Sequence, residues 1–185
     1  RALALPAHNA PMNPTLAPVP ADEVTPQPGL SVVLGGTGGI GAALVAQLRA
    51  QGGTVLALGR QTQPALDYTA EATVAACAQH VAEHLSQTGL PLTRLIVASG
   101  FLHGTTASGQ HAEPERSWQH LNADALAHSF AVNAVGPALV MKHFLPLLPR
   151  QGRCVAAFLS ARVGSIGDNA LGGWYGYRAS KAALN

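Results

Sequence analysis

Charged side chains are scarce in this sequence, and their scarcity excludes several classes of function. Asp, Glu, Lys and Arg make up 11% of its 185 residues, whereas a typical soluble domain has about 25%. The net charge is only +2 and no block of Lys or Arg occurs, so we expect neither a nucleic-acid partner nor a membrane partner. Because hydrophobic residues make up 48% of the chain, we expect a folded domain with a sizeable core rather than disorder.

Cysteine is scarce as well. Cys77 and Cys154 are far apart in the sequence, and no C-x-x-C pair occurs. The simplest interpretation is a reduced, cytoplasmic setting, with both cysteines packed as core side chains. The sequence also lacks a positively charged segment followed by an apolar one, so no signal peptide is expected.

Proline, by contrast, is concentrated in one segment. Residues 1–28 hold seven of the 13 prolines, a density that prevents a helix or a central strand. We therefore predict a flexible, proline-rich tail over residues 1–28 and a folded dinucleotide-binding domain over residues 29–185. The chain begins with Arg1, and we hypothesise that Met12 is the natural start.

The folded domain opens with a glycine-rich turn. The apolar run 30–34 predicts a buried strand, and the pattern over 40–52 predicts an amphipathic helix. Between them, Gly35, Gly39 and Gly41 give the spacing G-x-x-x-G-x-G. Such glycines allow a tight turn, a close approach of the backbone to a pyrophosphate, and close packing of helix on strand. The turn therefore predicts dinucleotide binding, although a purely structural turn fits the same glycines. No lysine follows them, which argues against a phosphate-hydrolysing P-loop.

The rest of the chain alternates between predicted strands and predicted helices. We expect strands at 54–58, 65–69, 91–98 and 153–159, a polar loop at 103–123, and helices at 71–87, at 124–148 with a bend at Gly136-Pro137, and from 174 onwards. This alternation predicts an α/β fold with a Rossmann-type, doubly wound parallel sheet and helices on both faces. Because active sites in such sheets lie beyond the carboxyl ends of the strands, the turns that follow the strands should converge on one crevice.

Arg60 follows the second predicted strand, where dinucleotide-binding folds distinguish two cofactors. An acidic residue here would bind the ribose 2′-OH of NAD, whereas an arginine suits the 2′-phosphate of NADP. Residues 58–63 contain no Asp or Glu, so NADP is favoured and NAD is the alternative. A solvated surface arginine would look the same in the sequence.

Tyr177 and Lys181 are four residues apart on the last predicted helix, which places both side chains on one face. A lysine ammonium near a phenol lowers the phenol pKa from about 10 towards neutral pH. Such a tyrosine can exchange a proton with a carbonyl or alcohol oxygen as a general acid or base. An ordinary helical Tyr/Lys pair has the same spacing, so the pair gains its meaning from the motifs that precede it.

Over about residues 30–185 these motifs resemble the short-chain dehydrogenase/reductase family, and the segment 160–175 looks closest to its C-factor-like branch. The motifs, in the family's order, are the glycine turn at 35–41, Leu66-Asp67-Tyr68-Thr69, Val97-Ala98-Ser99-Gly100 in place of N-N-A-G, Asn133, and Y-x-x-x-K at Tyr177 and Lys181. The resemblance implies an oxidoreductase that transfers hydride between NADP(H) and a small carbonyl or alcohol substrate.

The same resemblance implies a role for individual residues. Tyr177 would be the general acid/base, and Lys181 would hold the nicotinamide ribose and lower the tyrosine pKa. Asn133 would hold a water in a proton relay. The implied cofactor-binding residues are Gly35, Thr37, Gly38, Gly39, Ile40, Gly41, Arg60, Asp67, Tyr68, Ala98, Ser99, Gly100, Tyr177 and Lys181.

Three departures from the family pattern bear on catalysis. Leu34 replaces the threonine that opens the glycine motif, both asparagines of N-N-A-G are replaced, and Ala161 stands where the catalytic serine is usual. Ser160 is the nearest hydroxyl, but neighbouring strand residues point to opposite faces. Ser160 can serve only if the end of the strand turns it inward, and Ser165 is a weaker substitute. The alternative function is therefore an NAD(P)-binding regulatory or cell-signalling protein with weak or no turnover.

Two further expectations concern metals and the end of the chain. His80 and His84, with Glu83 between them, have a spacing that can bind a metal, but no third ligand is evident, so no metal site is predicted. Family members continue beyond Asn185 with two more strands and a substrate-covering segment. We therefore expect a C-terminally truncated domain in which the strand at 153–159 is an uncovered edge, and a homo-oligomer when the protein is full length.

Overall fold

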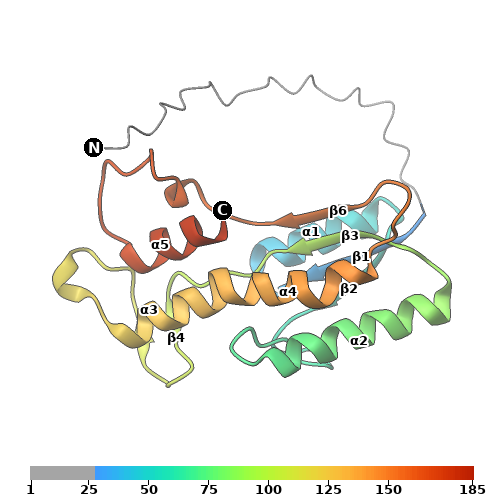
Figure 1. The fold of residues 1–185 in the computed structure, drawn as a ribbon, viewed down its shortest axis with the longest axis horizontal. Coiled ribbons are helices and arrows are strands. Elements are labelled where there is room, and N and C mark those ends of the chain that lie inside the picture. The colour runs from blue at the N-terminus through green and yellow to red at the C-terminus, as the bar shows by residue number, and fades with distance from the viewer. Residues whose placement is uncertain (1–27) are drawn as a thin grey trace, which may run out of the picture.

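The computed structural model describes residues 28–185 and shows a parallel sheet with helices on both faces (Figure 1). The predicted tail, apart from Pro28, and the hypothesis about Met12 lie outside the described residues. In chain order the elements are β1 (Leu30–Leu34), α1 (Gly39–Ala50), β2 (Thr54–Leu58), α2 (Glu71–Thr88), β3 (Leu92–Val97), β4 (Gly104–Thr105), β5 (His111–Ala112), α3 (Ala123–Phe130), α4 (Gly136–Phe144), β6 (Val155–Phe158) and α5 (Tyr175–Leu184). The predicted α/β, Rossmann-type architecture is confirmed.

The main sheet has four parallel strands in the order β2-β1-β3-β6. The chain runs outwards from β1 to β2 and then returns to place β3 on the other side of β1. The point where the strand order reverses therefore lies between β1 and β3, and ligands bind at such points in open α/β sheets. The register aligns Leu58, Leu34, Val97 and Phe158 at the carboxyl edge of the sheet.

Helix α1 covers one face of the sheet, and α2 and α4 cover the other (Figure 1). Every residue of β1 is buried, as expected for a central parallel strand that is covered on both faces. Leu30, Val32 and Leu34 alternate along β1 towards α2 and α4, where they join the main hydrophobic cluster. Phe144 of α4 is the largest fully buried side chain of that cluster. The core thus lies between the sheet and helices α2 and α4, along the whole length of β1.

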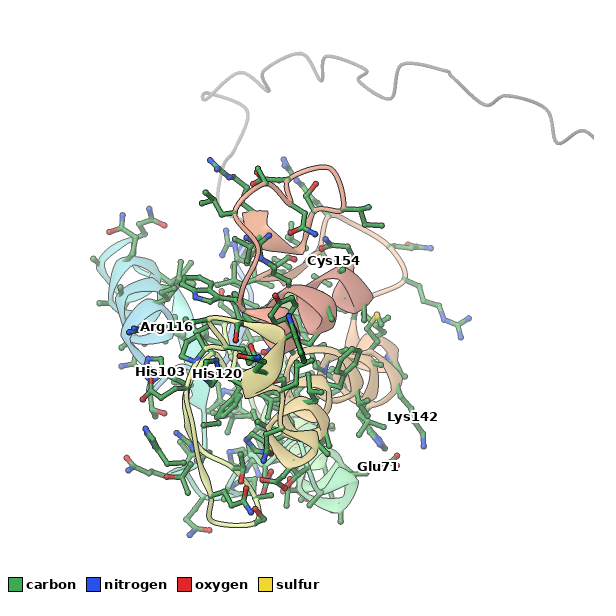
Figure 2. The ribbon with its side chains drawn as sticks, turned by 90° about the vertical axis from the view of Figure 1, so that its left-hand side faces the viewer. Glu71, His103, Arg116, His120, Lys142 and Cys154 are labelled. Atoms are coloured by element: carbon green, nitrogen blue, oxygen red, sulfur yellow. The ribbon has the colours of Figure 1, made fainter. Side chains whose placement is uncertain are left out.

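A surface ion-pair cluster joins the two helices of that face. The Glu71 carboxylate accepts hydrogen bonds from Lys142 Nζ at 2.6 Å and from His143 Nε2 at 2.9 Å, and Figure 2 shows Glu71 and Lys142 beside each other at the surface. The hydrogen bond from Lys142, followed by that from His143, lowers the pKa of the Glu71 carboxyl. The cluster ties the start of α2 to the end of α4.

The prediction of a strand at 65–69 is wrong. Leu66 and Tyr68 are buried while their neighbours are exposed, so the alternation that suggested a strand is real, yet the segment joins neither sheet. Its backbone is held by side chains instead: the Asp67 carboxylate accepts the Thr69 N–H at 2.8 Å, and Thr73 Oγ1 accepts the Asp67 N–H at 3.0 Å. Such local side-chain bonds compete with strand pairing.

The helix predicted at 124–148 is interrupted before the expected bend. α3 passes into a π-helical turn at Ala131–Val135, α4 begins at Gly136, and a 3₁₀ turn ends the segment at Leu145–Leu147. Pro137 has no N–H, so the carbonyl of Asn133 lacks its usual α-helical donor, and the helix widens at this point. The predicted loop at 103–123 contains the antiparallel β4–β5 pair and a 3₁₀ turn.

Strand β6 is the open edge of the sheet. Among the described residues it pairs with β3 alone, and Val155 is 46% exposed, as the sequence predicted for this strand. Cys154, which precedes β6, is half-buried at the surface rather than in the core (Figure 2). The prediction that Cys154 is a core side chain is wrong, because this edge of the sheet is poorly covered. Cys77 is fully buried, as predicted. Burial raises the pKa of the Cys77 thiol to about 11.

One segment, Ala123–Leu147, is long and apolar enough to cross a membrane by length and composition. Core helices of water-soluble proteins pass the same test, and a single such helix is weak support for a membrane span. Here Val140 and Phe144 are fully buried in the core cluster, and Asn133 uses its amide in hydrogen bonds to other segments. One face of the segment therefore packs into the core of this α/β fold, and 28% of its apolar window is buried.

Candidate active site

A cleft of about 870 Å³ lies at the carboxyl edge of the sheet, where the reversal of strand order places a binding site. It brings together residues from six separate parts of the sequence. The predicted site residues that line it are Gly35, Thr37, Gly38, Gly39, Ile40, Arg60, Asp67, Tyr68, Ala98, Ser99, Gly100, Ser160, Tyr177 and Lys181. Gly41 and Asn133 are buried behind these residues. The expected convergence of the turns on one crevice is therefore what the structure shows.

The glycine turn is held by contacts that leave no room for side chains. Gly35 has φ +82°, and a Cβ at this position would collide with the Ser99 hydroxyl. A Cβ at Gly41 would collide with the carbonyl oxygen of Gly35. The N–H groups of Gly35 and Gly36 both bond to the carbonyl of Leu58, at 2.7 and 3.1 Å. The glycine turn thus packs closely against the ends of β2 and β3. Residues without side chains allow such close packing, and they also let the backbone come close to a ligand.

The glycine turn places the start of α1 at the cleft. Gly38 is the N-cap of α1 and, being glycine, it has no side chain that could cap the helix. The first N–H groups of a helix have no intrahelical acceptor and carry the positive end of the dipole. Gly38 and Gly39 are exposed and line the cleft. This arrangement fits the pyrophosphate of a dinucleotide.

Arg60, Asp67 and Tyr68 form the side of the cleft beyond β2. Arg60 is exposed, so its guanidinium is free to reach a ligand phosphate. Tyr68 is 7% exposed and donates a hydrogen bond from its hydroxyl to Ser99 Oγ at 3.0 Å. Burial raises the pKa of Tyr68 to about 12. Tyr68 therefore braces the Ser99 loop more than it offers a surface to a ligand.

Asn133 links two segments at the end of the cleft that holds Tyr177 and Lys181. Its Nδ2 donates to the Phe101 carbonyl at 2.8 Å and to Ser180 Oγ at 2.9 Å, and its Oδ1 accepts the Phe101 N–H at 2.8 Å. Both amide protons are used in these bonds, and the residue is 0% exposed. The side chain thus joins the loop after β3 to helix α5. The water relay that the resemblance implies for Asn133 stays a prediction.

Helix α5 carries Tyr177 and Lys181 to the cleft on one face, as their spacing predicted. Lys181 Nζ donates to the Leu159 carbonyl at 2.8 Å and lies 5.8 Å from the centroid of the Tyr177 ring. Burial lowers the pKa of Lys181 and raises the pKa of the Tyr177 phenol. The expected lowering of the tyrosine pKa by the lysine is not what this arrangement gives. The ammonium is directed to a carbonyl, and desolvation of the phenol dominates.

Ser160 is one of several hydroxyl-bearing residues that line the cleft. Strand β6 ends at Phe158, so the alternation of a strand no longer governs residues 160 and 161. Ser160 lines the cleft and donates to Asn185 Oδ1 at 2.6 Å, while Ala161 starts a 3₁₀ turn. The Ser160 hydroxyl is thus bonded to Asn185, which is outside the residues that line the cleft, and its role in place of the catalytic serine stays a prediction.

Sequence reasoning missed part of the cleft wall. Phe101, His103, His128 and Leu159 also line it, and Phe101 packs edge-on against His128 with ring centroids 4.4 Å apart. A signal existed for Phe101, which directly follows the V-A-S-G segment. His128 stands four residues before Val132, which also lines the cleft, so helical spacing could have placed these two on one face.

The described part of the chain contains no group of three or more His, Cys, Asp or Glu side chains that could hold a metal ion. His84 is the one buried side chain with an unpaired polar atom, Nε2, among residues 28–185. It lies on α2, outside the residues that line the cleft.

Comparisons with known proteins agree with this fold. The short chain dehydrogenase family matches residues 30–185. The chain is 28% identical over 145 residues to 1-hydroxy-2-glutathionyl-2-methyl-3-butene dehydrogenase of Rhodococcus sp. (strain AD45), a match that covers 78% of this chain and 57% of that protein. It is 43% identical over 60 residues to C-signal of Myxococcus xanthus, covering 32% of this chain and 36% of that protein.

Solved structures give the same answer. The structure of NADPH bound carbonyl reductase from chicken fatty liver matches with a TM-score of 0.67 at 24% identity, over 85% of this chain and 68% of that one. This likeness shows the fold. The chain spans little more than half the length of the Rhodococcus dehydrogenase. Because the family match covers residues 30–185 and the order of elements agrees with it, this chain belongs to the short chain dehydrogenase family.

Proposed function

We propose that this chain is the cofactor-binding part of an NADP(H)-dependent carbonyl reductase or alcohol dehydrogenase. The observation that carries the proposal is that Tyr177 and Lys181 line the same cleft as the glycine turn and the start of α1. One end of the cleft thus fits a pyrophosphate, and the other holds a proton donor. The Rhodococcus relative is named a dehydrogenase, and the chicken carbonyl reductase was solved with NADPH.

Separate residues of this chain would bind the cofactor and donate the proton. The backbone N–H groups of Gly38 and Gly39 would hold the pyrophosphate, and Arg60 the 2′-phosphate. When bound, NADPH supplies a hydride to the substrate carbon. Tyr177 would donate the proton to the carbonyl oxygen. Burial raises the pKa of its phenol, so the phenol stays protonated at neutral pH, as a proton donor must.

We further propose that the natural protein is longer than this chain, cytoplasmic and a homo-oligomer. Large apolar side chains are exposed along α3, the π turn, α4 and the 3₁₀ turn after it: Phe130, Val135, Met141 and Leu145. These exposed side chains support the proposal of an interface with a second copy, because large exposed apolar patches mark protein interfaces.

The full-length protein tests the proposal directly. NADPH and NADH are titrated by fluorescence, and a panel of small ketones and aldehydes is screened for oxidation of the cofactor. Turnover of any carbonyl compound supports the proposal. Cofactor binding without turnover on the panel would instead support a regulatory or signalling protein. The replacement of the usual serine by Ala161 and the local likeness to C-signal favour that second function.

Arg60 is expected to set the preference between the two cofactors. Arg60→Ala should weaken NADPH binding by roughly tenfold, because a charge-assisted contact to the 2′-phosphate is lost, and leave NADH binding unchanged. Isothermal titration with both cofactors checks this. Arg49→Ala is the matched control, because Arg49 lies in the last turn of α1 and bonds to Val55 instead of lining the cleft. A wild-type preference for NADH that survives in Arg60→Ala would refute the role of Arg60.

Ser160 is expected to stabilise the substrate oxygen. Ser160→Ala should lower kcat by about 10- to 100-fold, because one hydrogen-bond donor to the developing oxyanion is lost. Ser165→Ala is the control, since Ser165 is exposed and outside the residues that line the cleft. Steady-state kinetics on the best carbonyl substrate distinguish them. An unchanged kcat in Ser160→Ala would mean that catalysis proceeds without a serine here.

A further inference from the structure

Helix α5, which carries Tyr177 and Lys181, lacks an N-terminal cap of its own. In the described chain, the N-cap residue Trp174 makes no side-chain hydrogen bond to the helix, and the first turn holds no acidic residue. Trp174 is also left-handed, with φ 52° and ψ 39°, a conformation that is uncommon for a bulky residue. The first N–H groups of a helix need acceptors from elsewhere.

Glu115, from the loop between β5 and α3, supplies those acceptors. Its carbonyl oxygen accepts the Trp174 N–H at 2.7 Å. Its carboxylate oxygens accept the Gly176 N–H, at 3.2 Å for Oε1 and 3.4 Å for Oε2. Glu115 is 8% exposed. A buried carboxylate at the positive end of a helix dipole is well placed electrostatically.

The local sequence of α5 is fitted to this contact. A Cβ at Gly176 would lie 3.0 Å from Glu115 Oε1 and 3.2 Å from Leu126 Cδ2, closer than side chains ordinarily approach. Gly176 therefore lets the carboxylate and α3 pack against the helix backbone. Tyr177 is the next residue. Any rotation or fraying of this turn moves the Tyr177 hydroxyl relative to the cleft.

We propose that Glu115 is a positioning residue that caps α5 and holds the Tyr177 hydroxyl at the reacting oxygen. This inference rests on the proposed function. Arg178 ties the preceding loop to the same turn, because its guanidinium donates to the carbonyls of Gly173 at 3.0 Å and Asp168 at 3.1 Å. Glu115 thus fixes the helix from the side of α3, and Arg178 from the side of the loop.

The chain offers a matched control two residues away. Glu113 belongs to the same loop, is exposed, and pairs with His111 at 2.7 Å. A change at Glu113 therefore alters the charge of the loop without touching the start of α5.

The test compares full-length wild type with Glu115→Ala, Glu115→Gln and Glu113→Ala. In Glu115→Ala, kcat should fall by about tenfold or more, because small displacements of a catalytic group are costly, while the Kd for NADPH stays within twofold. Glu115→Gln should recover part of kcat, since its amide oxygen can still accept the Gly176 N–H. Glu113→Ala should match wild type. Hydrogen exchange of residues 174–180 should accelerate in Glu115→Ala alone.

Two results would overturn the inference. One is an unchanged kcat in Glu115→Ala. The other is an equal loss of kcat and NADPH affinity, which would indicate general damage to the fold. If wild type itself shows no turnover, the proposed function fails, and hydrogen exchange then decides about Glu115. Faster exchange at 174–180 would support its capping role in positioning Tyr177, and unchanged exchange would refute it.

Discussion

Tyr177→Phe is expected to lower kcat for carbonyl reduction by about 10²- to 10⁴-fold, the contribution typical of a positioned general acid. The substitution removes one oxygen and leaves the ring, which is half-buried and packs edge-on against Trp174 with centroids 6.4 Å apart. The glycine turn and the start of α1 are untouched, so the Kd for NADPH should stay within about twofold. Stopped-flow measurement of NADPH oxidation, with fluorescence titration of NADPH, separates the two effects.

Tyr175→Phe is the matched control for this prediction. It makes the same chemical change two residues earlier on α5, at a half-buried tyrosine that is outside the residues lining the cleft. Its kcat should equal that of wild type. A full kcat in Tyr177→Phe would remove the proton-donor role and leave the fold as a nucleotide-binding scaffold. An equal loss in both variants would mean that the phenols matter for the packing of α5 instead.

The parts of the site that the sequence predicted well are those encoded locally. The glycine turn follows from the spacing of Gly35, Gly39 and Gly41 after an apolar strand, and the face of α5 follows from the four-residue spacing of Tyr177 and Lys181. Both depend on the geometry of one strand-turn-helix unit or one helix. Parallel pairing then brings them together, because every strand points its carboxyl end to the same edge of the sheet.

The parts that sequence reasoning missed depend on hydrogen bonds and burial that the residue pattern does not show. Residues 65–69 have the alternation of a strand, but the Asp67 carboxylate binds the Thr69 N–H, and such a local bond competes with strand pairing. Ser160 lies beyond the strand alternation because β6 ends earlier than its apolar run suggested. Burial raises the pKa of Tyr177, and burial is not visible in a Y-x-x-x-K motif. The contact between Glu115 and Gly176 joins residues 61 positions apart.

Gly41→Ala should cause the largest loss of stability among conservative changes in the turn. Alanine is a better helix former than glycine, so an exposed site in α1 would gain from this change. At Gly41, however, the new Cβ would collide with the Gly35 carbonyl and crowd Gly36 Cα at 3.0 Å. Those atoms are backbone, which cannot rotate away. We expect a loss of about 2 to 3 kcal/mol, which corresponds to a decrease in Tm of roughly 4 to 12 °C.

Gly39→Ala shows why this loss belongs to the contact and not to the residue type. Gly39 lies two positions earlier in the same helix, has no positive φ, and within residues 28–185 a Cβ there would meet nothing inside 4 Å. The Tm of Gly39→Ala should therefore equal that of wild type or lie slightly above it. Calorimetry of the protein without cofactor measures this. In Gly41→Ala the displaced Gly35 carbonyl also shifts the turn, so NADPH affinity should fall together with Tm. If Gly41→Ala melted at or above the wild-type temperature, helix α1 would not be seated on the turn as described, and the pyrophosphate site built from it would lose its geometric basis.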